Sequence, residues 1–166
     1  MNSGSIAFII ICASLVFLMT PGLAFFYGGL GRRKNVINTM MMCVLPIALA
    51  SVMWIVCGYS LSFGGKGDII GNLSHVFLNG VSETTSTRGL EIPDALFAAF
   101  QMMFPIITVA ILTGAAAGRM GFSALIIFIV FWLLLVYCPF AHMVWDEGLL
   151  AKWGTIDFAG GGVVHI

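Results

Sequence analysis

Four long stretches without a single charged residue constrain this chain more than any other feature. They cover residues 1–31, 35–65, 95–118 and 120–145. A transmembrane helix needs about 20 predominantly apolar residues to cross the hydrocarbon core of a bilayer, and each stretch is longer than that. The pattern therefore predicts a polytopic membrane protein of the all-α class, with the lipid bilayer as its surroundings.

The overall composition excludes an ordinary soluble domain. Of the 166 residues, 60% are hydrophobic and only 8% are charged. Soluble domains carry about 25% charged residues, and so few charges cannot cover the surface that a fold of this size leaves to water. Seven basic residues balance seven acidic ones, and the basic run Arg32-Arg33-Lys34 is too short to indicate a nucleic-acid partner.

The boundaries of the apolar stretches divide the chain into four complete spans and the start of a fifth. We predict these spans at about residues 5–30, 36–63, 94–118, 122–144 and 157–166. Pro21 and Pro46 lie inside the first two spans, where proline removes a backbone donor and favours a bend. The polar stretch 64–93 is predicted to be a loop outside the hydrocarbon. Small residues at Gly114 and Gly118 predict close helix packing.

The distribution of Lys and Arg between the short links predicts the orientation of the chain. Arg32, Arg33 and Lys34 lie between the first and second spans, and Arg119 lies between the third and fourth. Cytoplasmic links carry an excess of Lys and Arg, so both are expected on the cytoplasmic side of the cell membrane. The N-terminus is then extracytoplasmic, and Asp157 begins the fifth span at the outer surface.

The stretch Asp157–Ile166 carries the ionisable residue expected to lie deepest in the membrane. In a helix that rises 1.5 Å per residue, His165 would lie about 12 Å inward of Asp157. Ionisable side chains at such depth are costly and usually face a pathway or a partner. The alternatives are a hydrogen-bonded structural histidine and an Asp that caps the helix. The glycine-rich sequence would let a small solute or another helix approach the backbone of Ala159 and Gly160.

Aromatic residues in the third and fourth spans form a second candidate site. Phe100 and Phe104 are four residues apart, so their rings are expected on one face of a helix, with the polar Gln101 beside them. Trp145 ends the fourth span, where Trp is most often an interfacial anchor. Such rings can also bind a cation through their faces, although packing is the commoner use of this spacing.

No pattern in the sequence predicts a cofactor, a metal site or an enzyme. The four cysteines lie inside apolar spans without CxxC spacing, and the three histidines are scattered. These features favour packing residues over a disulfide or a metal-ligand cluster. No nucleophile lies in a recognisable arrangement with a base, so we expect no enzymatic activity and no cofactor.

Four motifs follow one another along the chain. They are Pro21-Gly-Leu-Ala-Phe-Phe-Tyr-Gly-Gly29 with the nearby Arg32, Lys34 and Asn35, then Phe100-Gln101-Met-Met-Phe104, Ala141-His-Met-Val-Trp145 and Asp157-Phe-Ala-Gly-Gly-Gly-Val-Val-His165. In sequence and order they resemble the signatures of the ammonium transporter (Amt) family. The related Rhesus-type channels are similar in fold but generally lack this Trp and this first-helix motif.

The resemblance implies a function and a role for each site residue. It implies a homotrimer in which each subunit conducts ammonium or ammonia through its own hydrophobic pore. Trp145 and Phe100 would recruit ammonium outside, supported by Asp157. Phe104 would be the first of two gate phenylalanines, and His165 the first of a pair of pore histidines.

The resemblance also implies that this chain is the N-terminal part of a longer transporter. Subunits of the family have eleven helices in two inverted five-helix repeats, and the 166 residues reach only into the fifth helix. The second repeat is therefore absent, as is the tail that helps dock P-II signalling proteins in this family. The alternative function is a non-transporting ammonium sensor or a regulatory membrane subunit.

Overall fold

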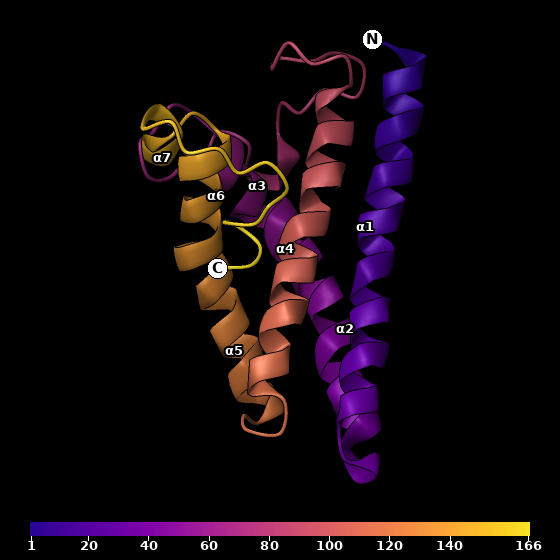
Figure 1. Cartoon of the computed structure of the whole chain (residues 1–166). Helices are drawn as coiled ribbons and strands as arrows, with labels where there is room; N and C mark the ends of the chain where they lie inside the picture. Colours follow the sequence, from indigo (N-terminus) through magenta and orange to yellow (C-terminus); the bar gives the residue numbers. More distant parts are fainter.

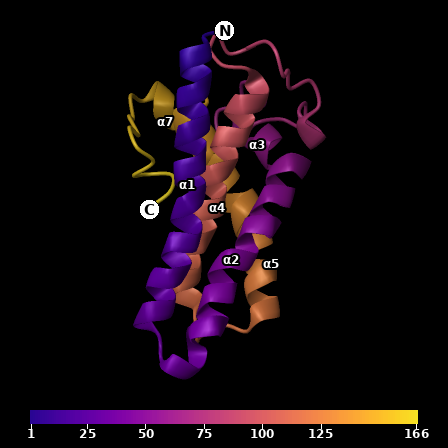
Figure 2. The same cartoon turned by 90° about the vertical axis from the view of Figure 1, so that its right-hand side faces the viewer.

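The computed structural model describes all 166 residues as a bundle of long helices without β-strands. Figure 1 and Figure 2 show long helical columns side by side, joined at alternate ends. Each column is long and apolar enough to cross a membrane: Ser3–Leu30, Arg33–Phe63, Asp94–Ala116 and Phe122–Lys152. The all-α class and the four predicted spans are confirmed.

The first and third columns are single α-helices. α1 (Ser3–Leu30) starts two residues before the predicted position, because the side chain of Asn2 accepts a hydrogen bond from the amide of Gly4 at 2.8 Å. It continues through Pro21. α4 (Asp94–Ala116) stops before the predicted end at residue 118, since Gly118 adopts a positive φ of 73° and turns the chain.

The second and fourth columns each contain a π-helical turn. The second comprises α2 (Val36–Met53), the π turn η2 (Trp54–Gly58) and α3 (Tyr59–Phe63). The fourth comprises α5 (Phe122–Trp132), the π turn η4 (Leu133–Tyr137) and α6 (Cys138–Trp145). A π turn inserts a residue into the helical repeat, so it changes which residues face the neighbouring helices. Hydrophobicity alone did not predict these turns.

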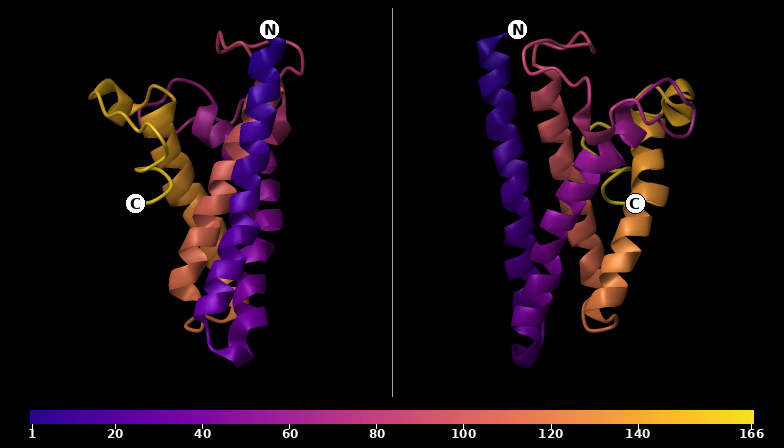
Figure 3. Two further views of the ribbon diagram at one scale, coloured as in Figure 1. Left: turned by 45° about the vertical axis from the view of Figure 1, so that its right-hand side comes forward. Right: turned by 180° about the vertical axis from the view of Figure 1, so that it is seen from behind.

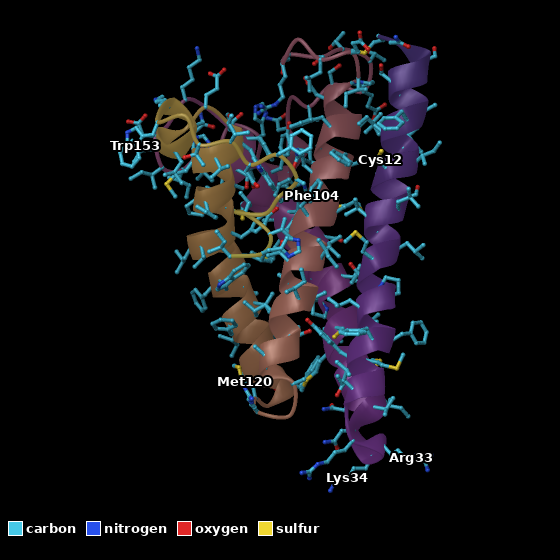
Figure 4. All side chains as sticks on the ribbon, viewed as in Figure 1. Cys12, Arg33, Lys34, Phe104, Met120 and Trp153 are labelled. Atoms are coloured by element: carbon cyan, nitrogen blue, oxygen red, sulfur yellow. The ribbon has the colours of Figure 1, made fainter.

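The two ends of the bundle differ in chemistry. The end at the top of Figure 1, here called the upper end, holds the N-terminus, the long loop between residues 64 and 93 and the short helix α7 (Leu149–Lys152). The lower end holds the two short links, one with the 3-10 turn η1 (Arg33–Asn35); Figure 4 shows Arg33, Lys34 and Met120 there. Both basic links therefore lie at one end.

Close packing of α1 depends on small residues. Only Thr20, Ala24 and Gly28 of this helix are buried, and their spacing of four residues places them on one face. At Gly28 an added Cβ would lie 2.8 Å from a side-chain carbon of Met40. The rest of α1 exposes large apolar side chains, as a lipid-facing helix does.

The predicted small-residue contact is made by Gly114 and not by Gly118. A Cβ on Gly114 would lie 2.5 Å from the ring of Tyr27, whose hydroxyl donates to the carbonyl of Ile111 at 3.2 Å. Nothing lies within 4 Å of the equivalent position on Gly118, because that residue belongs to the turn.

The predicted fifth helix differs from the structure. Residues 157–166 form bends and turns beside α4 and the α5–α6 column, on the far side from α1 (Figure 3). Three successive glycines each weaken a helix by about 1 kcal/mol, and Gly160 takes a positive φ of 75° that breaks the helical path. Two helix-like bonds remain, from the amides of Val164 and Ile166 to the carbonyls of Gly160 and Gly162.

We expect Gly114→Ala to destabilise the bundle by about 1–3 kcal/mol, because the Tyr27 ring must move away from α4. The matched control is Gly22→Ala, which adds the same methyl group to a helical position with no atom within 4 Å. Thermal unfolding in detergent measures both. Equal melting temperatures for the two variants would contradict the packing role of Gly114.

Candidate functional site

Three aromatic rings form a continuous row between α4 and α6. The Phe100 and Phe104 rings have centroids 5.1 Å apart and meet edge to face at 89°. The Trp145 ring at the end of α6 meets Phe104 at 5.7 Å and 65°. Figure 4 labels Phe104 in the upper half of the bundle. The residues predicted from their spacing thus come together, with the Trp added from another helix.

Asp157 connects this row to the C-terminal turns. Its carboxylate accepts hydrogen bonds from the indole N–H of Trp145 at 3.1 Å and from the amides of Gly162 at 3.1 Å and Val163 at 3.2 Å. The capping alternative predicted for Asp157 is close to this arrangement, although the carboxylate stabilises a glycine turn and not a helix. The bond from the indole N–H also fixes the orientation of the Trp145 ring.

The row of three aromatic rings and the glycine turn held by Asp157 line a hollow of about 390 Å³, here called the aromatic hollow. It is lined by the following ten residues, which come from α3, α4, α6 and the C-terminal segment: Phe63, Phe97, Phe100, Gln101, Phe104, Trp145, Asp157, Phe158, Ala159 and Gly160. Six of the seven site residues predicted from the sequence are among them.

The chemistry of the aromatic hollow suits a small cation with N–H groups. Its walls are ring faces and edges, with one carboxylate and one amide side chain, and no Lys or Arg lines it. The amide oxygen of Gln101 is buried without a hydrogen-bond partner. A cation against aromatic faces gains about 0.5 kcal/mol when exposed and about 2 kcal/mol when desolvated.

His165 lies apart from the aromatic hollow. Its exposed side chain lines a second, smaller hollow of about 200 Å³ with Thr108, Ile111 and Leu112 of α4. These residues follow Phe104 by one to two helical turns, so His165 lies roughly 6–12 Å further towards the lower end along α4. The structure therefore places it beyond the Phe104 ring when viewed from Trp145, without contact to Asp157.

A polar vestibule of about 670 Å³ lies next to the aromatic hollow, at the upper end. The two hollows share Phe63, Phe97 and Trp145 as walls. Charged groups line the vestibule: Lys66, Arg88, Asp94, Asp146, Glu147 and Lys152. No sequence pattern assigned a role to Phe63 or Phe97, because an aromatic ring at or near a helix end looks like any packing residue until its neighbours are known.

His142 also has a structural role at this end. Its buried ring lies between two backbone carbonyls, with Nδ1 3.0 Å from the oxygen of Ser62 and Nε2 2.8 Å from that of Gly67. It therefore joins α6 to the end of α3 and to the loop between residues 64 and 93.

Comparison with known proteins decides the family. The model of the Ammonium Transporter Family matches residues 7–166. The chain belongs to the ammonium transporter family. It is 47% identical over 166 residues to an ammonium transporter of Bacillus subtilis (strain 168), covering 100% of this chain and 41% of the relative. The chain thus spans about two fifths of the length of that relative.

Solved structures of this family share the fold. The crystal structure of Candida albicans Mep2 matches with a TM-score of 0.90 and 32% identity, over 99% of this chain and 36% of that one. A structure titled Sensor Amt Protein matches with a TM-score of 0.85 and 30% identity, over 96% of this chain and 40% of that one.

We expect Asp157→Ala to loosen the glycine turn, because the amides of Gly162 and Val163 lose their acceptor. Loss of about 1 kcal/mol per bond corresponds to roughly fivefold faster hydrogen exchange at each of these two amides. Glu83→Ala is the control, since this exposed carboxylate has no bond to the turn. Unchanged exchange in the Asp157 variant would show that the carboxylate does not stabilise the turn.

Proposed function

We propose that this chain forms the entry half of an ammonium pore in the cell membrane. Ammonium is recruited in the aromatic hollow by Trp145 and Phe100, next to Asp157. It then passes Phe104 as a gate and reaches His165 deeper in the membrane. The observation that carries the proposal is the order of these groups along α4. The aromatic hollow with the Asp157 carboxylate comes first, the Phe104 ring follows, and the His165 imidazole lies beyond it.

The physical chemistry of the path supports conduction as ammonia. A bare ammonium ion is very costly to move through a dry apolar passage, whereas neutral ammonia is not. An imidazole at depth can hydrogen-bond ammonia and take part in a proton relay. Potassium has a similar size but cannot lose a proton, so the same passage would reject it.

The orientation proposed from the sequence is consistent with the bundle. The two links that contain Arg32, Arg33, Lys34 and Arg119 lie at the lower end. The aromatic hollow shares walls with the vestibule, which lies at the upper end. Since Lys and Arg are retained on the cytoplasmic side, we propose that the upper end faces the outside. Ammonium would then enter from outside, and the N-terminus would be extracytoplasmic.

Two further proposals come from the resemblance alone. We propose a homotrimer of complete subunits, in which a second repeat supplies the partner of His165 and the second gate ring. Binding of a P-II signalling protein would depend on a tail outside these residues. The sensor function is not favoured, because the matching family and the Bacillus subtilis relative are transporters by name.

A chimera tests the proposed function. Residues 1–166 replace the matching portion of the Bacillus subtilis transporter, and the chimera is expressed in a strain that lacks ammonium uptake. We expect growth on limiting ammonium, as with the parent transporter. A chimera that reaches the membrane at the parent's level without supporting growth would contradict the proposal.

In the chimera, we expect Trp145→Leu to raise the KM for ammonium roughly tenfold, since one cation–π contact is worth up to about 2 kcal/mol when desolvated. The matched control is Trp153→Leu, because Trp153 is 72% exposed and lies on the outside of the upper end (Figure 4). The KM is measured with isotope-labelled ammonium in proteoliposomes, and equal values for both variants would exclude recruitment by Trp145.

The role of His165 is tested with His165→Asp in the same chimera. We expect altered ammonium currents or entry of potassium, because a carboxylate holds a cation where the imidazole would bind neutral ammonia. Ammonium currents that stay unchanged, with potassium still excluded, would remove His165 from the proposed pathway.

A further inference from the structure

The positively charged side chain of Arg88 lies against the two rings that separate the vestibule from the aromatic hollow. The guanidinium carbon of Arg88 lies 5.1 Å from the ring centroid of Phe63 and 5.0 Å from that of Phe97. These two rings meet edge to face at 5.2 Å and 79°. Arg88 lines the vestibule and not the aromatic hollow, whereas both rings line the two spaces.

Both ends of the guanidinium fork are hydrogen-bonded. Nη1 donates to Oδ1 of Asp146 at 2.6 Å, and Nη2 donates to the backbone carbonyl of Phe63 at 2.5 Å. The side chains are only 25% and 11% exposed for Arg88 and Asp146. Burial by itself would lower the pKa of the guanidinium, but the hydrogen bond and the charge of Asp146 raise it above its ordinary value. The pair is therefore charged and well oriented.

The loop that carries Arg88 is itself held in place. The buried carboxylate of Asp94, at the start of α4, accepts hydrogen bonds from the amide of Thr87 at 2.9 Å and from its hydroxyl at 2.8 Å. Asp146 is the residue that follows Trp145, and its second oxygen lies 3.5 Å from Nδ1 of His142. Arg88 thus connects the start of α4, the end of α3 and the end of α6.

We propose that Arg88 is a positioning residue that also determines where a cation can bind. By holding Asp146, it fixes the end of α6 and with it the Trp145 ring. By covering the vestibule side of Phe63 and Phe97, it prevents a small cation from binding to that side of these two rings. The proposal rests on the proposed recruitment of ammonium, and it adds a residue to which neither the family motifs nor the comparisons assign a role.

The shape of the side chain is essential to this role. A planar guanidinium can stack on two rings while its two nitrogens bond a carboxylate and a carbonyl that lie in different directions. A lysine ammonium is a single point of charge and cannot satisfy both acceptors from one position. We therefore expect that charge alone does not replace Arg88, whereas a free guanidinium ion does.

The chimera described above tests the proposal with three variants. We expect Arg88→Ala and Arg88→Lys to raise the KM for ammonium uptake roughly tenfold, the usual effect of losing a charged hydrogen bond, with little change in the maximal rate. Millimolar guanidinium should restore the KM of Arg88→Ala by filling the vacated place, and should leave the unsubstituted chimera unchanged. Lys66→Ala removes another vestibule cation, one with no ring contact, and should behave like the unsubstituted chimera.

Each other outcome counts against the proposal. A normal KM in either Arg88 variant would show that the fork is not needed. If the KM rises and guanidinium does not restore it, Arg88 has only a folding role. The same conclusion follows if less of the variant reaches the membrane while the KM stays unchanged. If the unsubstituted chimera transports no ammonium, the proposed function fails, whereas failure of the Arg88 variants alone leaves it standing.

Discussion

The need to satisfy every backbone polar group without water shapes this protein throughout. Inside the hydrocarbon a continuous helix does so, and the long helices of this bundle continue through Pro21 and the two π turns. Irregular backbone appears where side chains can cap it. Asp94 and Asp157 bind the amides of Thr87, Gly162 and Val163, so the loops that form the site depend on buried or half-buried carboxylates.

Two carboxylates next to Trp145 give the upper end its electrostatic character. Asp157 belongs to the aromatic hollow, where no basic side chain approaches it, and its oxygens already orient Trp145 and the glycine turn. Asp146, one residue after Trp145, is neutralised by Arg88. The aromatic hollow therefore combines one carboxylate with aromatic rings, while Arg88 covers the vestibule side of Phe63 and Phe97.

The fold brings together most of the residues named from the sequence, because the family motifs lie on the elements that line the aromatic hollow. Six of the seven predicted residues line the aromatic hollow, and His165 lies below it. Phe63, Phe97 and Arg88 were not predicted. Their neighbours come from segments 25 to 58 residues away, so only contacts such as those of Arg88 with the Phe63 carbonyl and with Asp146 distinguish them from packing and loop residues.

The spacing of the charges by itself determined the number of long apolar spans and their limits to within about two residues, because crossing a bilayer requires a long uncharged segment. It also placed both basic links at the same end of the bundle. Tertiary structure alone decided the rest. It made Gly114 a contact for Tyr27 and Gly118 a turn, and it folded residues 157–166 into turns around Asp157. These outcomes depend on which side chain meets which neighbour, and hydrophobicity along the chain carries no such information.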